Sequence, residues 1–435
     1  MRQYHLFING EAQSGGVFRP DSTERENGLI RLYPSQTDQV WEGFGGAVTD
    51  SAAYVFSLMQ PEQQQELLDA YFGADGLGYT LLRVPIDSCD FSLEQYEAAP
   101  DGDPDRFDME RPLRYILPML EAIRKRAPGI TLMLSPWSPP KCFKTNGKRH
   151  GGGKCKPEHY AAWAEYICRY IREFEDRGFP VSLIYLQNEP HASQTWDSCL
   201  WTAEEERAFL VGAMKPALVR NGFSGVQVYI WDHNKERVLE RALEVLDDEG
   251  RRAADGIAFH WYSGDHFDAL RRTHALFPEK KLLLSENCIE YSKFDLKDPV
   301  LPRNAIAHEI LGDLECGTNA FFDWNMVLDS RGGPNYVKNY CHAPLLYNES
   351  EGVLRRQSTY DSLWHFARFI VPGSRRILTS SFTSEVETTA FARPDGAVAL
   401  VLLNRGARRK AAVSLGGELA EITLPARSLV TLLIL

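Results

Sequence analysis

Long hydrophobic runs are missing from this 435-residue chain. Its longest apolar stretches, such as residues 429–435, are far shorter than the ~20 residues that a membrane-spanning helix needs. The N-terminal residues lead into a polar segment, without the apolar core and small-residue cleavage site of a signal peptide. We therefore expect no membrane span and a cytoplasmic location, in a protein of bacterial origin.

A basic surface is missing as well. The formal net charge is −11 and the pI is about 5.6. An acidic surface repels phosphate backbones, so nucleic acid is not an expected partner. The glycine-rich segment at 43–46 lacks the Lys-Ser/Thr that completes a phosphate-binding loop. Close backbone packing is the interpretation we favour for it, and no cofactor is expected.

Closely spaced cysteine pairs are also absent, because no two cysteines form a CxxC motif. The even number of cysteines would permit disulfides, but scattered thiols in a chain without a signal peptide favour the reduced state. The eight cysteines are Cys89, Cys142, Cys155, Cys168, Cys199, Cys288, Cys316 and Cys341.

The sequence does contain a series of short apolar runs, each followed by a polar turn and a helical pattern. Alternating strands and helices predict a parallel sheet. The runs extend over roughly 280 residues, which suits a (β/α)8 barrel. They are Gly43–Val48, Thr80–Val84, Ile130–Leu134, Ser182–Leu186, Val226–Ile230, Gly256–Phe259, Lys281–Leu284 and Ala320–Trp324.

Helical patterns lie between these runs. The clearest covers Pro157–Glu175, where aromatic and aliphatic residues recur along one helical face. Thr202 followed by Glu205 forms a capping box, which predicts the start of a helix over Ala203–Leu218.

Both ends of the chain have a different pattern, with short strands in place of alternating elements. Tyr4–Ile8 and Gly28–Tyr33 are predicted strands at the N-terminus, and several more follow Ser374, with a hairpin turn at Pro394-Asp395-Gly396. We expect an α/β protein, a (β/α)8 TIM barrel with a side β-sandwich formed by both ends. The predicted domains are N-terminal sandwich strands at 1–40, the catalytic barrel at 41–350 and the C-terminal sandwich at 351–435. The C-terminal strands are predicted at Arg376–Leu378, Val386–Ala392, Ala397–Asn404, Lys410–Leu415, Leu419–Leu424 and Ser428–Leu435.

Functional side chains in such a barrel gather where the strands end. Glu189 and Glu286 follow the fourth and seventh predicted strands. Two carboxyl groups suit glycoside cleavage, since one protonates the departing oxygen and the other attacks or activates water. Asn188 is placed to hold a sugar 2-hydroxyl. A buried Arg83 requires a carboxylate partner, for which the candidates are Asp50, Glu189 and Glu286.

The other side chains at the strand ends suit a carbohydrate, because amides pair with hydroxyls and indole faces stack on pyranose rings. Together with the two glutamates and Asn188, the predicted substrate-binding residues are Arg83, Asp90, Trp137, His260, Tyr262 and Trp324.

Two other classes of function stay open at this stage. A binding barrel without catalysis would share the same aromatic and amide side chains. A metal-dependent hydrolase would use Asp232, His233 and His260, but no His pairing on one element supports a metal site, and none is expected. His260 is equally compatible with a buried core histidine.

The chain resembles glycoside hydrolase family 30, and within it the glucosylceramidase-like branch. That resemblance implies Glu189 as acid/base, Glu286 as nucleophile and retention of configuration. It also implies that Asp90, Trp137, Asn188 and Trp324 hold the sugar, with Arg83 and His260 in support. The segments that carry it are GFGGAVTDSAA (43–53), LLRVPIDSCDFS (81–92), LSPWSPPKCFKTNG (134–147), QNEP (187–190), GIAFHWY (256–262), LLSENC (283–288) and FFDWNMVLDSRGGPNY (321–336).

The sequence departs from the lysosomal members of that family at the rim of the site. Cys142 stands where those members place a tryptophan, and the segment 148–154 is basic and glycine-rich. We therefore expect an exo-acting β-glucosidase of oligosaccharides or of aryl and alkyl glycosides, with its two glutamate carboxyls about 5–5.5 Å apart. An endo-β-1,6-glucanase or a β-xylosidase of the same family is the alternative, and the oligomeric state stays open.

Overall fold

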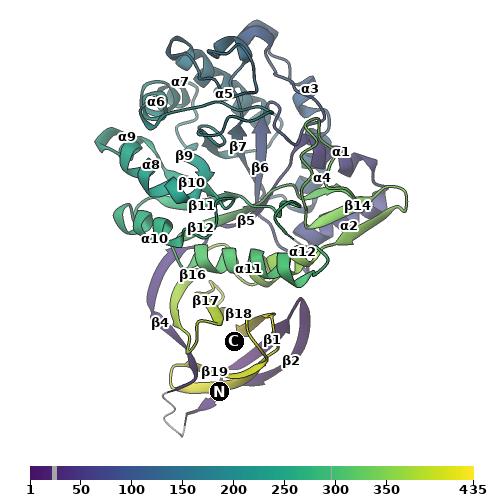
Figure 1. Cartoon of the computed structure of the whole chain (residues 1–435), viewed down its shortest axis with the longest axis vertical. Helices are drawn as coiled ribbons and strands as arrows, with labels where there is room; N and C mark the ends of the chain where they lie inside the picture. Colours follow the sequence, from purple (N-terminus) through teal and green to yellow (C-terminus); the bar gives the residue numbers. More distant parts are fainter. Residues whose placement is uncertain (22–26, 295) are drawn as a thin grey trace.

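A computed structural model of the protein describes residues 1–21, 27–294 and 296–435. Eight parallel strands close into a barrel in the order β10-β11-β12-β5-β6-β7-β8-β9, which forms the upper part of Figure 1. All eight predicted runs are confirmed, and the predicted barrel is correct. The strands are β5 (Gly43–Ala47), β6 (Leu81–Ile86), β7 (Thr131–Pro136), β8 (Val181–Tyr185), β9 (Gln227–Asn234), β10 (Gly256–His260), β11 (Lys281–Glu286) and β12 (Thr318–Asp323).

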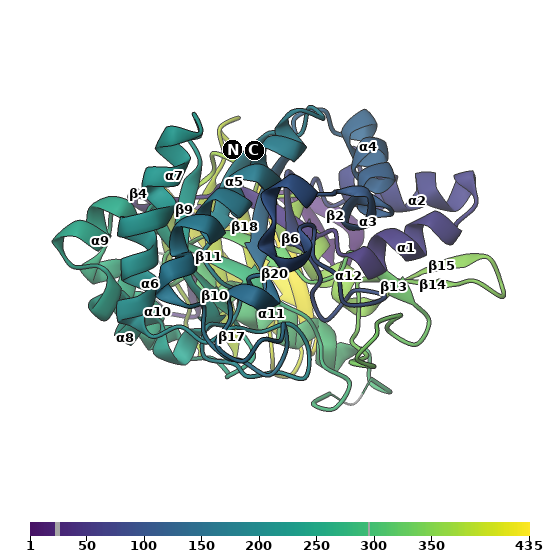
Figure 2. The same ribbon diagram turned by 90° about the horizontal axis from the view of Figure 1, so that it is seen from above.

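Helices surround the barrel, as the view from above shows (Figure 2). A buried layer fills its interior, with Leu81, Tyr185, Tyr229 and Phe322 in one cluster. The helices are α1 (Asp50–Leu58), α2 (Pro61–Phe72), α3 (Glu110–Leu113), α4 (Ile116–Arg126), α5 (Tyr160–Glu175), α6 (Ala203–Phe209), α7 (Lys215–Arg220), α8 (Val238–Val245), α9 (Asp248–Ala253), α10 (Phe267–Leu276), α11 (Val300–Leu314) and α12 (Ser358–Ala367).

The two predicted helices illustrate how the local sequence specifies this ring. A 3-10 turn at Pro157–His159 leads into α5, which buries one apolar face. The capping box of Thr202 and Glu205 is present at the start of α6. A π-helical turn at Leu210–Met214 joins α6 to α7, so the predicted helix over Ala203–Leu218 is present as two α-helices with a turn of wider hydrogen-bond spacing between them.

Strands from both chain ends form one ten-stranded sheet below the barrel, where both termini lie (Figure 1). All the predicted terminal strands are present. The pairing is antiparallel as expected, except that β19 pairs with β4 in parallel. The sheet order is β2 (Glu11–Val17), β1 (Gln3–Ile8), β21 (Ser428–Ile434), β18 (Val398–Asn404), β17 (Val386–Ala392), β16 (Arg375–Ser380), β4 (Leu29–Val40), β19 (Arg409–Leu415), β20 (Glu418–Leu424) and β3 (Arg19–Pro20).

The part of the chain that follows the last barrel strand, β12, and precedes β16 contains a small three-stranded sheet and α12. Its strands are β13 (Val327–Asp329), β14 (Leu345–Asn348) and β15 (Val353–Arg356). The predicted boundary at residue 351 falls in the turn between β14 and β15, whereas the large sheet begins again only at β16. α12 packs against α11 of the barrel.

Candidate active site

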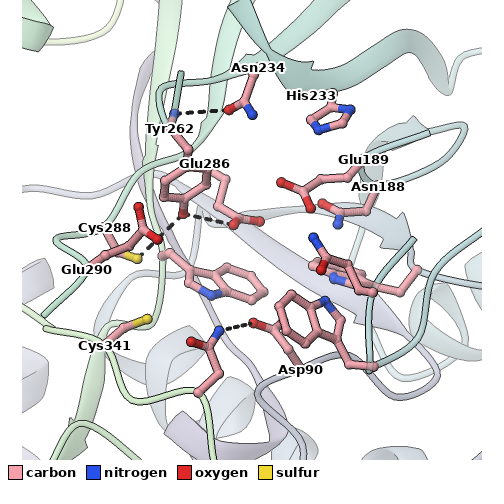
Figure 3. Close-up of a pocket in the computed structure, with 15 residues that line it drawn as sticks. Asp90, Asn188, Glu189, His233, Asn234, Tyr262, Glu286, Cys288, Glu290 and Cys341 are labelled. Atoms are coloured by element: carbon pink, nitrogen blue, oxygen red, sulfur yellow. Dashed lines mark hydrogen bonds between the residues drawn. The ribbon is translucent and has the colours of Figure 1, made fainter. Parts of the chain in front are cut away.

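The carboxyl ends of the barrel strands open into a pocket of about 230 Å³. Most of the predicted site residues line it, and Figure 3 shows Glu189 and Glu286 facing the same space, with Asp90 at one end. Arg83 and His260 are fully buried and contact the glutamates from below the pocket surface. The lining residues are Asp90, Trp137, Asn188, Glu189, Gln194, Trp196, His233, Asn234, Tyr262, Glu286, Cys288, Glu290, Trp324, Asn339 and Cys341.

The backbone is strained where β8 and β9 reach the pocket. Glu189 has φ 48°, and Trp231 and Asp232 have φ 74° and 55°. Positive φ is uncommon for residues other than glycine, and it persists where the surrounding structure enforces it. The amide of Glu189 donates to the carbonyl of Asp232 at 2.9 Å, which ties the two strained segments together. The position of the Glu189 side chain is therefore fixed by its backbone.

Glu286 is held by two donors, one on each oxygen. Arg83 Nη1 donates to Oε2 at 2.6 Å, and the Tyr262 hydroxyl donates to Oε1 at 2.9 Å. Burial raises the pKa of Glu286, and the charge on Glu189 adds to the rise, while His260 and Arg83 act against it. The pKa of Glu286 lies above the ordinary glutamate value.

Arg83 connects the ends of β8, β9 and β11. Its guanidinium donates to Asn188 Oδ1 and to Asp232 Oδ2, each at 2.8 Å, as well as to Glu286. Of the three predicted partners only Glu286 is correct, because Asp50 pairs with Arg111 and Glu189 is bonded to His260. Asp232 is a partner of Arg83 that the sequence did not predict, because it was a candidate only as a metal ligand.

Glu189 accepts a hydrogen bond from a histidine. His260 Nδ1 lies 3.3 Å from Glu189 Oε1, and Nε2 lies 3.1 Å from Asp232 Oδ1. Burial favours a raised pKa for Glu189, but the His260 hydrogen bond and the charges of His233 and His260 lower it below the ordinary value. Burial alone would lower the pKa of His260, yet Glu286, Asp232 and Glu189 together raise it to about 9.

Two indoles and a carboxyl group form the end of the pocket. Trp137 and Trp324 stack with ring centroids 5.4 Å apart and planes 21° apart. Asp90 accepts from Asn339 Nδ2 at 3.4 Å. Burial, with the nearby charges of Glu286 and Glu189, raises the pKa of Asp90 well above its usual range.

Loop residues complete the rim, and no pattern in the sequence predicts several of them. Gln194 and Trp196 follow the predicted end of the fourth strand, Leu186, by eight and ten residues, and Asn339 lies in the segment before β14. Asn234 and Cys288 lie closer to strand ends. Asn234 is the last residue of β9, and its Oδ1 accepts from the Tyr262 amide at 3.0 Å, while Cys288 follows the end of β11 by two residues.

The basic segment 148–154 belongs to the scaffold of this rim. Arg149 is buried and forms ion pairs with Asp87 and Asp197 at 3.3 and 3.4 Å. The amide of Gly151 donates to the carbonyl of Gln194 at 2.8 Å. The segment therefore fastens the loop that carries Gln194 and Trp196, and its charge is neutralised internally.

The hydrogen bonds of Asp232 do not favour the alternative of a metal-dependent hydrolase. Asp232 accepts from Arg83, Ser135, Ser285 and His260, so its oxygens are occupied by cations and hydroxyls. Within residues 1–21, 27–294 and 296–435 no group of three or more His, Cys, Asp or Glu side chains is arranged to hold a metal. The same part of the chain contains no helix that is both long and apolar enough to span a membrane.

A parallel eight-stranded barrel with a buried and a partly buried glutamate at an indole-lined pocket defines a glycoside hydrolase. The chain belongs to glycosyl hydrolase family 30: residues 41–370 match the TIM-barrel domain of that family and residues 373–432 match its β-sandwich domain. The resemblance noted from the sequence motifs is thereby confirmed.

Known relatives and structures agree with this assignment. Mouse lysosomal acid glucosylceramidase is 33% identical over 87% of this chain and 77% of its own length. The crystal structure of SrfJ from Salmonella typhimurium is 36% identical, with a TM-score of 0.96 over 100% of this chain and 99% of that one. A solved endo-β1,6-glucanase is 26% identical, with a TM-score of 0.87 over 99% and 98% of the two chains.

Proposed function

We propose that the protein is a retaining exo-β-glucosidase that removes a terminal β-linked glucose by double displacement. The observation that carries this proposal is the pair Glu189 and Glu286, which line one pocket from the ends of β8 and β11. Their hydrogen-bond partners differ, and two carboxyls in different environments take different roles.

Glu286 is the proposed nucleophile. Hydrogen bonds from Arg83 and Tyr262 favour its charged form and fix the direction of the carboxylate. As Glu286 attacks the anomeric carbon, Glu189 gives a proton to the departing oxygen. In the second step Glu189 takes a proton from water, and that water releases the sugar from Glu286 with the original configuration.

The size of the pocket supports exo action. A volume of about 230 Å³ lies below the ~300–1,000 Å³ of pockets for drug-sized ligands, and suits one sugar ring. Asp90, fastened to Asn339, lies at the far end, where it would meet hydroxyls of a terminal sugar. Glucose is the proposed sugar, because a relative of 33% identity is named a glucosylceramidase.

Endo-β-1,6-glucan hydrolysis is the second candidate. The observation in its favour is the likeness to a solved endo-β1,6-glucanase over nearly the whole chain. An endo enzyme would release oligosaccharides from the interior of the polymer, whereas the proposed exo enzyme releases only glucose.

The decisive experiment compares nitrophenyl β-glycosides of several sugars, β-1,6-glucan and glucosylceramide, with all products identified. We expect the β-glucoside to be hydrolysed fastest, and the first sugar released to be the β-anomer by NMR. Glu286→Gln should abolish turnover of every substrate. Release of the α-anomer would contradict retention, and internal cutting of the glucan would replace the exo assignment by the endo one.

A further inference from the structure

Glu189, His260 and Asp232 form a continuous hydrogen-bonded chain beneath the pocket. The two ring nitrogens of His260 lie 3.3 Å from Glu189 and 3.1 Å from Asp232. The imidazole is fully buried, so water does not compete for either nitrogen. A histidine between two carboxyl groups has an acceptor on each side, and this arrangement stabilises a proton on both nitrogens.

Asp232 is fixed as the ionised end of this chain. Its oxygens accept from Arg83 Nη2 at 2.8 Å, from Ser135 Oγ at 3.0 Å and from Ser285 Oγ at 2.6 Å. The pKa of Asp232 is lowered despite burial, chiefly because Arg83 is so close. Nε2 of His260 therefore keeps its proton, and the second ring proton lies on the side of Glu189.

The titratable groups around His260 come from two strands and one loop. Asp232 and His233 lie on β9, Glu286 on β11, and Glu189 follows β8. The neighbouring Tyr262 ring meets the imidazole edge-on at 6.0 Å. Three carboxyl groups surround one histidine, so its positive charge is compensated locally.

We infer that His260, oriented by Asp232, stores the proton that Glu189 delivers to the leaving group and takes it back when water attacks. His260 is thus a positioning residue for proton transfer, and the inference rests on the proposed role of Glu189. The pair can hold the same protons in two ways: as His260 imidazolium with Glu189 carboxylate, or as neutral His260 with Glu189 carboxylic acid. Glu189 can therefore act as an acid although its own pKa is lowered.

Over one complete turnover the enzyme neither gains nor loses a proton. The Nδ1–H bond of His260 breaks as the O–H bond of Glu189 forms. That proton then joins the departing oxygen while Glu286 bonds to the anomeric carbon. In the second half water gives one proton to Glu189 and its oxygen to the sugar, Glu286 leaves as carboxylate, and the proton returns to Nδ1.

The test compares two leaving groups on the sugar that the unaltered enzyme hydrolyses fastest. A dinitrophenolate leaves without a proton, whereas an alkoxide or methoxyphenolate requires one. For His260→Gln we expect kcat/KM to fall about 10²–10⁴-fold for the poor leaving group, the usual contribution of general acid catalysis. For the dinitrophenyl glycoside, the fall in kcat/KM should be less than about a tenth as large. Retained turnover of this substrate also shows that the variant is folded.

The pH profile gives a second and independent readout. In the unaltered enzyme the basic limb of kcat/KM should lie near pH 9, where the shared proton is lost. In His260→Gln and in Asp232→Asn the limb should move to lower pH. Tyr262→Phe is the matched comparison, since it removes a contact to Glu286 and should slow both leaving groups alike.

Equal losses for both leaving groups in His260→Gln, or an unmoved basic limb, would overturn the inference and leave His260 a purely structural residue. Failure of the glucosidase proposal is distinguishable, because it would appear in the unaltered enzyme as turnover of a different sugar or of internal bonds.

Discussion

At the scale of single residues, Asp90 is the side chain that we propose to control sugar selectivity. It is buried at the end of the pocket, where it accepts a hydrogen bond from Asn339. We expect Asp90→Ala to lower kcat/KM for the β-glucoside about 10²-fold, because removing one partner of a buried hydrogen bond costs about 1–3 kcal/mol and a carboxyl group can form two such bonds with the sugar. Deoxy-glucosides provide the control: removing the hydroxyl that Asp90 binds should slow the unaltered enzyme and leave the variant unaffected. Additive losses would show that Asp90 acts only through the fold.

Glu286 determines the acidic side of the pH profile at the same scale. It must be ionised to attack, and burial together with Glu189 raises its pKa. The carboxylate fraction, and with it kcat/KM, should therefore fall as the pH drops through a value above 4.5, the ordinary glutamate pKa. The measurement is kcat/KM of the dinitrophenyl glycoside from pH 4 to 7. An acidic limb of kcat/KM at or below the ordinary glutamate pKa would mean that Arg83 and His260 lower the pKa of Glu286 by more than burial raises it.

The position of Glu189 and Glu286 in one pocket could be predicted from the sequence, because each follows an apolar strand and strand ends converge in a barrel. The partners of Arg83 and His260 could not be derived in the same way. Their identity depends on the strained backbone of β9, which turns Asp232 beneath the pocket at a positive φ. No periodicity in the sequence signals such a bend.

At the scale of elements, the loop between β7 and α5 supports the rim through Arg149. Its side chain is 3% exposed and lies between Asp87 and Asp197. Removing one partner of a buried ion pair costs about 3–5 kcal/mol, since the remaining charges stay buried without compensation. We expect Arg149→Met to lower the free energy of unfolding by that amount and to raise KM, as the loop that carries Trp196 loosens.

Lys148→Met is the matched control, because Lys148 is the exposed neighbour of Arg149. Surface substitutions of this kind stay within about 0.5 kcal/mol. Urea unfolding of both variants measures the difference. Similar stabilities would show that water already compensates Asp87 and Asp197 in the folded protein.

Element boundaries illustrate what local sequence specifies well. All eight barrel strands and the Thr202 cap follow from patterns of fewer than about ten residues, which act locally. The parallel pairing of β19 with β4 joins residues from opposite ends of the chain, and the position of Asn339 beside Asp90 depends on the path of a loop. Both are set by long-range packing.

At the scale of the whole molecule, barrel and sheet share one hydrophobic core. Phe391 and Val401 of the sheet belong to the same buried cluster as Ile306 and Phe366 of the barrel helices. The sheet is therefore part of the packed body that supports α11 and α12. Its loss would expose the apolar side of those helices.

His365 on α12 provides one of the buried polar contacts between the two parts. Its Nε2 accepts from the Gly10 amide at 2.7 Å, which is possible only for neutral imidazole, and Nδ1 lies 2.8 Å from Thr431 Oγ1. Burial, assisted by the charge of Arg303, lowers the pKa of His365 to about 3. A depressed histidine pKa gives stability that is complete above the unfolded value near 6.5 and declines as the pH falls towards 3.

The unfolded chain binds a proton on this histidine below pH 6.5 and the folded protein does not, so unfolding becomes more favourable in acid. Between pH 7.5 and pH 5 the linkage amounts to about 2 kcal/mol. We expect the unaltered protein to lose that much more unfolding free energy over this range than His365→Asn, measured by urea unfolding at both pH values. The variant is less stable at pH 7.5, but its stability should depend less on pH, because the other histidines titrate in both proteins and cancel in the difference. Parallel losses in the two proteins would show that His365 accepts a proton without opening the contact between helix and sheet.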